Sequence, residues 1–334
     1  MNNLKDMVFS AKNIAVISHI NPDGDSLGSA LALAVTLSTI NSNVTLYIND
    51  VLPAKYEFLP EVHRFIMFKE EELEEFDITF VLDCGDIDRL GSSRSLADRT
   101  KNLVNIDHHV SNNHYGDINI IDVKASSTSQ MVYHLIDEIL QLPITPEVAT
   151  CLYVGIVTDT GSFKYDNTSP ETHRVVAKLL ELGVDIEDIT IHLFQNNSYK
   201  GVKFLGEFLK SLEILIDGKL ALATISLQML NKYSLDPDET DSIINYGRDI
   251  KGVEVAVTLK EVDKNLIKIS LRSKTNIDVN EIAKAFGGGG HKKASGATLK
   301  GTIEEVRERV VEEVRKAFMH NGDGSHCAIG IRNR

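Results

Sequence analysis

The sequence predicts an α/β protein with a mostly parallel sheet covered by helices on both faces, followed by a smaller α+β domain. Two observations carry this prediction. Short, β-branched, almost continuously apolar segments alternate with helical patterns through the first half, as in parallel sheets that are buried on both faces. After about residue 205, paired apolar segments flank turn residues, which is typical of antiparallel hairpins.

The first half supplies the elements of the parallel sheet in order. Strands are expected at residues 14–18, 44–48, 78–82 and 103–106, and helices at 26–40, 128–140, 147–157 and 170–182. The helix at 26–40 places Leu27, Leu31, Ala34 and Leu37 on one face. Because ligands bind at the carboxyl ends of strands in such sheets, the residues that follow the strands are the first candidates for a site.

The second half supplies two hairpins and a terminal helix. Segments 212–216 and 220–225 flank Asp217-Gly218, and segments 253–259 and 267–272 flank a polar loop. Thr302 and Glu305 form a capping box that begins a helix running to about residue 319. We therefore expect a first domain at 1–185, a helical linker at 186–204 and a second domain at 205–320. Residues 321–334 show no periodicity, and we expect a disordered or appended tail.

Composition excludes several classes of protein. The chain has 334 residues and a net charge of −13, which disfavours a protein that coats long nucleic acid through a positive field. Three widely spaced cysteines without a Cys-X-X-Cys pair give neither a disulfide framework nor a zinc ribbon. The apolar runs are too short to span a bilayer, and the N-terminus lacks a signal peptide, so we expect a cytoplasmic protein without membrane partners.

Five polar segments stand out, four of them at or near the ends of expected core elements. The candidate residues are His19, Asp23 and Asp25; Asp83; Asp107, His108 and His109; Asp159; and the glycine-rich run at 287–296. Each has an ordinary structural interpretation when taken alone. An aspartate after a strand commonly caps the next helix, and a glycine run is commonly a flexible loop.

Taken together, these side chains indicate a metal site. Several carboxylates that converge would repel one another without a cation, and carboxylate plus imidazole without thiolate suits Mn²⁺ or Mg²⁺ better than structural zinc. More carboxylates than one ion requires suggest two metal ions, an arrangement that clamps an in-line displacement at phosphorus.

The order of the motifs resembles a known family. Asp107-His108-His109, together with the His-X-X-Pro-Asp-X-Asp segment at 19–25, the Leu-Asp-Cys-Gly-Asp segment at 82–86 and the Thr-Asp-Thr-Gly segment at 158–161, is similar to the DHH phosphoesterases. The segment Gly-Gly-Gly-Gly-His-Lys-Lys-Ala-Ser-Gly at 287–296 resembles their DHHA1 domain. The likeness covers about residues 1–318 and is strongest to the oligoribonuclease (nanoRNase)/pAp phosphatase group.

The resemblance implies a role for each catalytic-domain residue. It implies that His19 and Asp23 bind one metal ion, that Asp25, His108 and Asp159 bind a second, and that Asp83 bridges both. A bridging hydroxide would then attack phosphorus, with His109 assisting the leaving oxygen and Asp107 orienting a histidine. The implied cofactor is two Mn²⁺ ions, with Mg²⁺ or Co²⁺ as substitutes.

In the second domain the resemblance implies contacts to the substrate. Arg272 and His291 would hold a distal phosphate or nucleotide, with the backbone of Gly288, Gly289 and Gly290 close to phosphate oxygens. Lys292 and Lys293 would add charge or lie solvated on the surface, and the residues leave both open. The substrate would lie in a cleft between the two domains.

The implied function is hydrolysis of very short oligoribonucleotides to mononucleotides, and of 3′-phosphoadenosine 5′-phosphate (pAp) to AMP. Long duplexes would not bind, and a homodimer is possible within the family. Two alternatives stay open: a phosphodiesterase for linear or cyclic dinucleotides, and a non-catalytic nucleotide sensor. The sensor is disfavoured because all six metal-ligand candidates are present.

Overall fold

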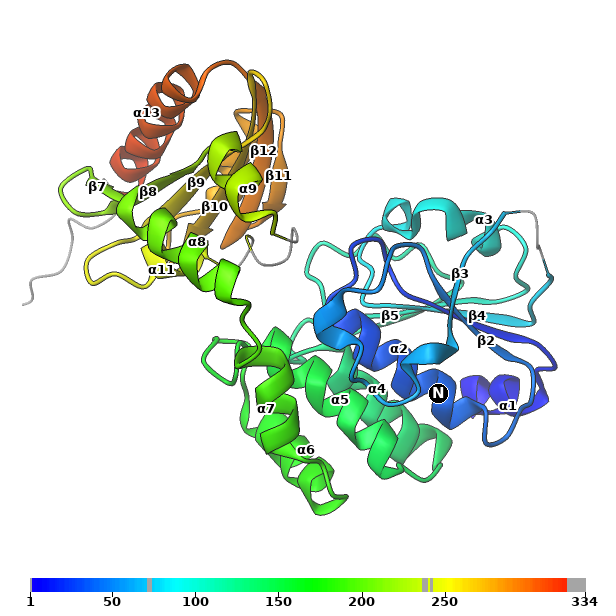
Figure 1. Cartoon of the computed structure of the whole chain (residues 1–334). Helices are drawn as coiled ribbons and strands as arrows, with labels where there is room; N and C mark the ends of the chain where they lie inside the picture. Colours follow the sequence, from blue (N-terminus) through cyan, green and yellow to red (C-terminus); the bar gives the residue numbers. More distant parts are fainter. Residues whose placement is uncertain (1, 71–73, 236–239, 241–242, 323–334) are drawn as a thin grey trace, which may run out of the picture. The chain divides into compact units, whose positions relative to one another are not determined.

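The computed structural model describes residues 2–70, 74–235, 240 and 243–322, and divides the chain into two compact units, 1–196 and 197–334 (Figure 1). The expected tail lies outside the described residues from residue 323 onward. Within the described ranges, no helix is long and apolar enough to cross a membrane.

The first unit contains a six-stranded sheet in which every pairing is parallel. Its strands are β1 (Ile14–Ile17), β2 (Val44–Ile48), β3 (Phe65–Met67), β4 (Ile78–Leu82), β5 (Leu103–Asp107) and β6 (Ile118–Ile121), in the order β3-β2-β1-β4-β5-β6. The four central strands confirm the prediction. The edge strands β3 and β6 were not predicted, because they are short and half-exposed and carry a weaker apolar pattern.

Helices cover both faces of this sheet, as predicted. They are α1 (Asn2–Ser10), α2 (Gly24–Leu37), α3 (Arg94–Ala97), α4 (Thr128–His134), α5 (Pro146–Asp159), α6 (Pro170–Glu181) and α7 (Ile186–Phe194), with 3₁₀ turns η1 (Ala54–Tyr56), η2 (Val62–Arg64) and η3 (Ile87–Ser93) and a π-helical segment η4 (Leu135–Leu140). Ile14 and Val16 of β1 belong to the core that α2 and α5 cover. Ala15 and Ile17 point to the opposite face, in the core with Leu96 of α3.

Glycines let α2, α4 and α5 approach one another unusually closely. A Cβ atom on Gly28 of α2 would lie 2.4 Å from the carbonyl oxygen of Cys151 in α5. A Cβ atom on Gly155 of α5 would lie 1.9 Å from Oγ of Ser129 in α4. This close packing matters for function because the ends of α2 and α5 carry candidate site residues and the start of α4 donates hydrogen bonds to one of them.

The sheet order reverses between β1 and β4, which are hydrogen-bonded neighbours. From β1 the chain runs outward through β2 to β3, and from β4 it runs outward in the other direction through β5 to β6. Ligands of open α/β sheets bind outside the carboxyl ends of the strands at such a reversal. His19 follows β1 and Asp83 follows β4, so both lie at this point.

The second unit is an α+β domain with a mixed six-stranded sheet. Its strands are β7 (Glu213–Leu215), β8 (Leu220–Ile225), β9 (Val255–Asp263), β10 (Leu266–Ser273), β11 (Gly289–His291) and β12 (Ala294–Lys300), and its helices are α8 (Tyr199–Lys210), α9 (Leu227–Tyr233), α11 (Ile244–Arg248), α12 (Val279–Lys284) and α13 (Ile303–Gly322). Both predicted hairpins are present, β7–β8 and β9–β10. The predicted capping box is also present: Thr302 N–H donates to Glu305 at 3.0 Å, and Glu305 N–H donates to Thr302 Oγ1 at 3.3 Å.

The close packing of α2 on α5 can be tested with a single methyl group. Gly28→Ala should destabilise the chain by about 1–3 kcal/mol, because the new Cβ would meet a backbone carbonyl that cannot rotate away. Gly206→Ala in α8 is the matched control, since a Cβ there meets nothing within 4 Å and alanine favours helix. Thermal unfolding should therefore shift in opposite directions for the two variants. Equal shifts would refute the close contact.

Candidate metal and catalytic centre

A cluster of aspartates and histidines lies at the carboxyl ends of β1, β4 and β5, joined by the ends of α2 and α5. Its members are His19, Asp23, Asp25, Asp83, Asp107, His108, His109 and Asp159. Two groups, His19-Asp23-Asp83 and Asp25-His108-Asp159, each have ligand atoms within 4.8 Å of one another, as does a third, Asp83-His108-His109. The structure thus brings together every catalytic-domain residue that the sequence singled out.

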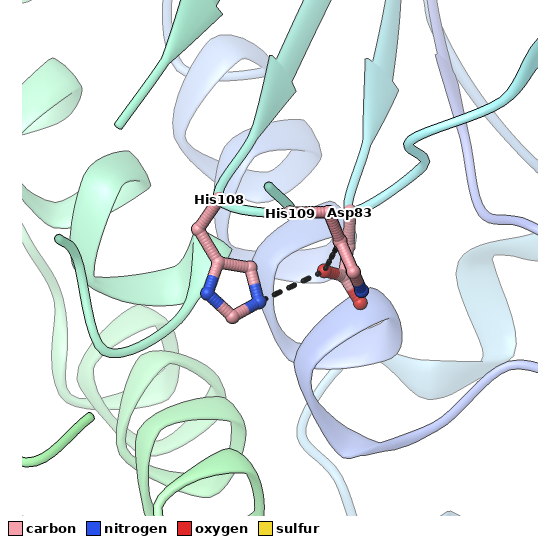
Figure 2. A group of neighbouring side chains, drawn as sticks. All are labelled: Asp83, His108 and His109. Atoms are coloured by element: carbon pink, nitrogen blue, oxygen red, sulfur yellow. Dashed lines mark ion pairs between the residues drawn. The ribbon is translucent and has the colours of Figure 1, made fainter. Parts of the chain in front are cut away.

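Asp83 lies at the centre of the cluster. It is 2% exposed and has φ of 56°, a left-handed conformation that costs a non-glycine residue free energy and turns the chain sharply after β4. Its carboxylate lies 3.5 Å from His19 Nε2, 3.6 Å from His108 Nε2 and 3.6 Å from His109 Nδ1. Figure 2 shows this carboxylate together with His108 and His109. The Asp83 carboxylate therefore lies within 3.6 Å of all three imidazoles.

His19 and Asp23 extend the cluster on the β1 side. His19 Nδ1 lies 2.7 Å from the carbonyl oxygen of Ile20, and Nε2 lies 3.5 Å from the Asp83 carboxylate. Asp23 is the N-cap of α2, where one carboxylate oxygen accepts from the N–H groups of Asp25 and Ser26. Asp23 thus combines the ordinary capping role with membership of the cluster.

Asp25, His108 and Asp159 form the other group. Nε2 of His108 lies 4.0 Å from Asp25 and 3.6 Å from Asp159, while Nδ1 faces the carbonyl oxygen of Ala125 at 3.4 Å. Asp159 is the last residue of α5, whereas the sequence suggested a turn beyond the helix. The two helix ends and the β5 loop therefore converge on one volume.

The N-terminus of α4 holds Asp25 in place. The Asp25 carboxylate accepts hydrogen bonds from the N–H groups of Thr128 at 2.6 Å and Ser129 at 2.8 Å. These groups are among the N–H donors that have no partner within the helix at its start. Oγ1 of Thr128 also donates to Asp83 at 3.1 Å. Ser127 caps the same helix, so the segment before α4 both begins the helix and orients two carboxylates.

The electrostatics of the cluster fit a bound cation. Burial, followed by the neighbouring carboxylates, raises the pKa of Asp83 well above its usual value. Burial, with the charges of Asp25 and Asp23, raises the pKa of Asp159 to about 8. Burial likewise lowers the pKa of His19, which favours the neutral imidazole that metal ions bind. Positive charge at the centre would remove the cost of ionising these carboxylates together.

His109 belongs to a separate hydrogen-bonded chain. Its Nδ1 lies 2.6 Å from Asp107, which is fully buried, and Asn112 Nδ2 donates to the other oxygen of Asp107 at 2.6 Å. Burial disfavours the charged form of Asp107, yet the hydrogen bonds from His109 and Asn112 outweigh it and hold its pKa below the usual value. Asp107 therefore stays ionised and orients the His109 imidazole.

Three supporting residues were missed by sequence reasoning. Asn112 also donates to Asn105 at 2.8 Å, Asn167 donates to Asp159 at 3.2 Å, and Arg89 lies beside His19. Asn112 lies only five residues after Asp107, so its closeness in sequence to a candidate site residue could have indicated the contact. For Asn167 and Arg89 the contacts arise only once separate loops come together, so no local pattern marks them.

In the second unit, Arg272 and His291 lie on the same face of the sheet. Arg272 of β10 and His291 of β11 are both paired with Ala294 of β12, and directly paired residues in antiparallel strands point to the same side. His291 is exposed and Arg272 half-buried, while Lys292 and Lys293 are exposed.

The predicted glycine run is largely an edge strand rather than a free loop. Gly289 and Gly290 pair with β12, and Gly290 has φ of 144°. A Cβ atom on Gly288 would lie 2.1 Å from the carbonyl oxygen of Gly296. Glycine is therefore required at 288 and 290 for the close approach of the chain.

Known proteins share this organisation. Residues 13–156 match the DHH family, N-terminal domain, and residues 217–320 match the DHHA1 domain. The chain is 33% identical to the bifunctional oligoribonuclease and PAP phosphatase NrnA of Thermus thermophilus, over 92% of this chain and 91% of that protein. It is 26% identical to the protein of the same description from Bacillus subtilis, over 84% and 87%.

A solved structure agrees over nearly the whole length. An exopolyphosphatase-related protein from Bacteroides fragilis is 28% identical to this chain, with a TM-score of 0.88 over 96% of this chain and 95% of that one.

The raised carboxylate pKa values predict a pH-dependent gain of stability from metal. Between the ordinary aspartate pKa of 3.8 and about 8, the folded metal-free chain keeps a proton on Asp159 that the unfolded chain has lost. Raising the pH through this window therefore lowers the stability of the metal-free chain, and Mn²⁺ should raise the melting temperature more at pH ~8 than at pH ~5.

Thermal melts with and without metal check this expectation. In the metal-free state, Asp159→Asn should lose less stability than the wild type between the two pH values, and Asp98→Asn, at an exposed position, should behave as the wild type. A metal-free Asp159→Asn chain with the wild-type pH dependence would contradict the assignment.

Substitution of the two adjacent histidines, His108 and His109, should have different effects on metal binding and turnover. His108→Ala should lose at least about tenfold in affinity for one metal ion, since Nε2 faces three carboxylates. His109→Ala should keep its metal content and lose turnover, because Nδ1 is engaged by Asp107. Metal analysis of both purified variants decides the matter, and equal loss of metal would refute the division.

Proposed function

This chain belongs to the DHH family and is a metal-dependent hydrolase, and on that premise we propose that it cleaves very short oligoribonucleotides to mononucleotides and pAp to AMP. The observation that carries the proposal is the position of Asp83, which belongs to one candidate metal-ligand group with His19 and Asp23 and lies 3.6 Å from His108 of the other group. Relatives described as oligoribonuclease and PAP phosphatase support the substrate class.

We propose that the two groups hold two ions. His19, Asp23 and Asp83 would bind one, and Asp25, His108 and Asp159 the other, with Asp83 bridging. Mixed carboxylate and imidazole donors favour Mn²⁺, with Mg²⁺ or Co²⁺ as substitutes. Ions held there supply Lewis-acid charge and make a nucleophile available near neutral pH.

The chain's own groups then complete the reaction. His109, oriented by Asp107 through a 2.6 Å contact at Nδ1, would deliver a proton to the leaving oxygen of the scissile phosphate. Asn112 fixes the far oxygen of Asp107, so that the carboxylate cannot rotate away from His109.

Arg272 and His291 would hold a second phosphate or the neighbouring nucleotide of a short substrate, alongside the backbone of residues 288–290. Arginine suits this task because its planar fork pairs with two phosphate oxygens. A net charge of −13 gives no broad basic surface for a long strand, which supports a short substrate.

Side-by-side turnover with Mn²⁺ tests the proposed substrates. A diribonucleotide, a pentaribonucleotide, pAp, a linear dinucleotide with a 5′-phosphate, a cyclic dinucleotide and a ribonucleotide 20-mer are compared at equal concentration. The diribonucleotide and pAp should be hydrolysed and the 20-mer should not. Faster cleavage of the 20-mer, or of the cyclic dinucleotide alone, would overturn the proposal. Asp83→Ala is the inactive control.

Arg272 of the second unit should contribute to substrate binding. Arg272→Ala should lower kcat/KM for the diribonucleotide at least about tenfold, or about 1.4 kcal/mol, mainly through KM. Metal content should be unchanged, because Arg272 belongs to the other unit from every metal ligand. Lys268→Ala, an exposed residue of the same strand, is the control. A kcat/KM within about twofold of wild type would exclude a phosphate-holding role for Arg272.

A further inference from the structure

We propose that Arg89 is a further catalytic residue, whose guanidinium contacts a nonbridging oxygen of the scissile phosphate and stabilises the negative charge that develops there. The proposal rests on the phosphoesterase function proposed above. The proposal places the Arg89 guanidinium next to the reacting phosphate, on the His19 side of the metal ligands.

The position of Arg89 is the first observation. Its Nη2 lies 3.1 Å from Nδ1 and 3.4 Å from Nε2 of His19, a fully enclosed residue of the cluster, and the side chain is half-buried. Arg89 therefore lies against the cluster at His19 and is partly exposed to solvent.

The contact between Arg89 and His19 would change if the imidazole bound a metal ion. A guanidinium N–H can donate only to an imidazole nitrogen that carries a lone pair. That lone pair is the one a metal ion would take. A bound ion would therefore displace the guanidinium from that nitrogen, while the backbone would keep Arg89 beside the site.

The ion pairs of the described residues leave the Arg89 guanidinium without a carboxylate partner. Among the residues that the structure describes, no carboxylate forms an ion pair with Arg89, whereas Arg94 in the same segment pairs with Asp88. Four aspartates of the two groups offset the charge of two divalent ions, so the substrate phosphate would be the uncompensated anion next to Arg89. Arginine beside a reacting phosphate lowers the barrier by stabilising transition-state charge.

The backbone of Arg89 is fixed to the loop that carries His19. Its carbonyl oxygen accepts from Ile20 N–H at 2.8 Å, and a Cβ on Gly91 would lie 2.7 Å from Ile20. Asn49 ties the same two segments together, donating to Ser18 O at 3.2 Å and to Ser93 Oγ at 2.8 Å. Such anchoring limits the guanidinium to short movements within the site, as pre-organised charge stabilisation requires.

The test uses the full chain loaded with Mn²⁺ and three variants, Arg89→Ala, Arg89→Lys and the control Arg94→Ala. Manganese content is measured first, then binding of inorganic phosphate by calorimetry, then kcat and KM on the diribonucleotide. Arg89→Ala should retain its manganese, bind phosphate at least about tenfold more weakly and lose about 100-fold or more in kcat, the scale on which single charge-stabilising donors act. Arg89→Lys should recover part of the phosphate affinity, and Arg94→Ala should match wild type.

Unchanged phosphate affinity in Arg89→Ala would overturn the proposal, as would failure of the wild type to bind phosphate. Loss of manganese would also overturn it and make Arg89 a positioning residue for His19. If Arg89→Ala does not fold, the same criteria apply to Arg89→Lys, whose kcat must fall at least about tenfold for loss of the planar fork. If the wild type binds phosphate but cleaves no oligoribonucleotide, the proposed substrate fails while the binding comparison still decides the role of Arg89.

Discussion

Repulsion among buried carboxylates is the constraint on which the first unit depends. Asp25 and Asp83 are almost completely enclosed, and the pKa of each is raised, first by burial. Isolated charges in such surroundings are costly, and a protein retains them only where something compensates. The sheet topology determines where the carboxylates meet. They lie at the carboxyl ends of β1 and β4, the two central strands between which the strand order reverses. A bound cation would supply the compensation.

The fold keeps these groups in position through rigid, close contacts. Glycines at the crossing of α2, α4 and α5 let three helix ends converge, and α4 donates two N–H groups to Asp25. Asp83 is held in a left-handed conformation directly after its strand. The chain thus carries the cost of strain and repulsion in the metal-free state, which is the expected pattern where binding and catalysis require a pre-organised site.

Much of this could be predicted from the sequence, for identifiable reasons. Strands such as β4 are buried on both faces and therefore read as continuous apolar runs, and the aspartates and histidines after them stand out against that background. The half-exposed strands β3 and β6 lack this contrast.

The supporting contacts could not be predicted in the same way. Asn167 reaches Asp159 across a loop, and Arg89 reaches His19 from a segment 70 residues away in the chain. Neither residue differs locally from an ordinary surface polar residue. These contacts form only when separate loops come together, so the metal-ligand candidates can be predicted from motifs, whereas Asn167 and Arg89 cannot.

The most direct test of the account is anomalous X-ray diffraction from crystals of the chain loaded with Mn²⁺. The account predicts two peaks roughly 3.5–4 Å apart, one beside His19 and Asp23, the other beside Asp25, His108 and Asp159, with Asp83 contacting both. A single ion, or two ions that do not share Asp83, would contradict it.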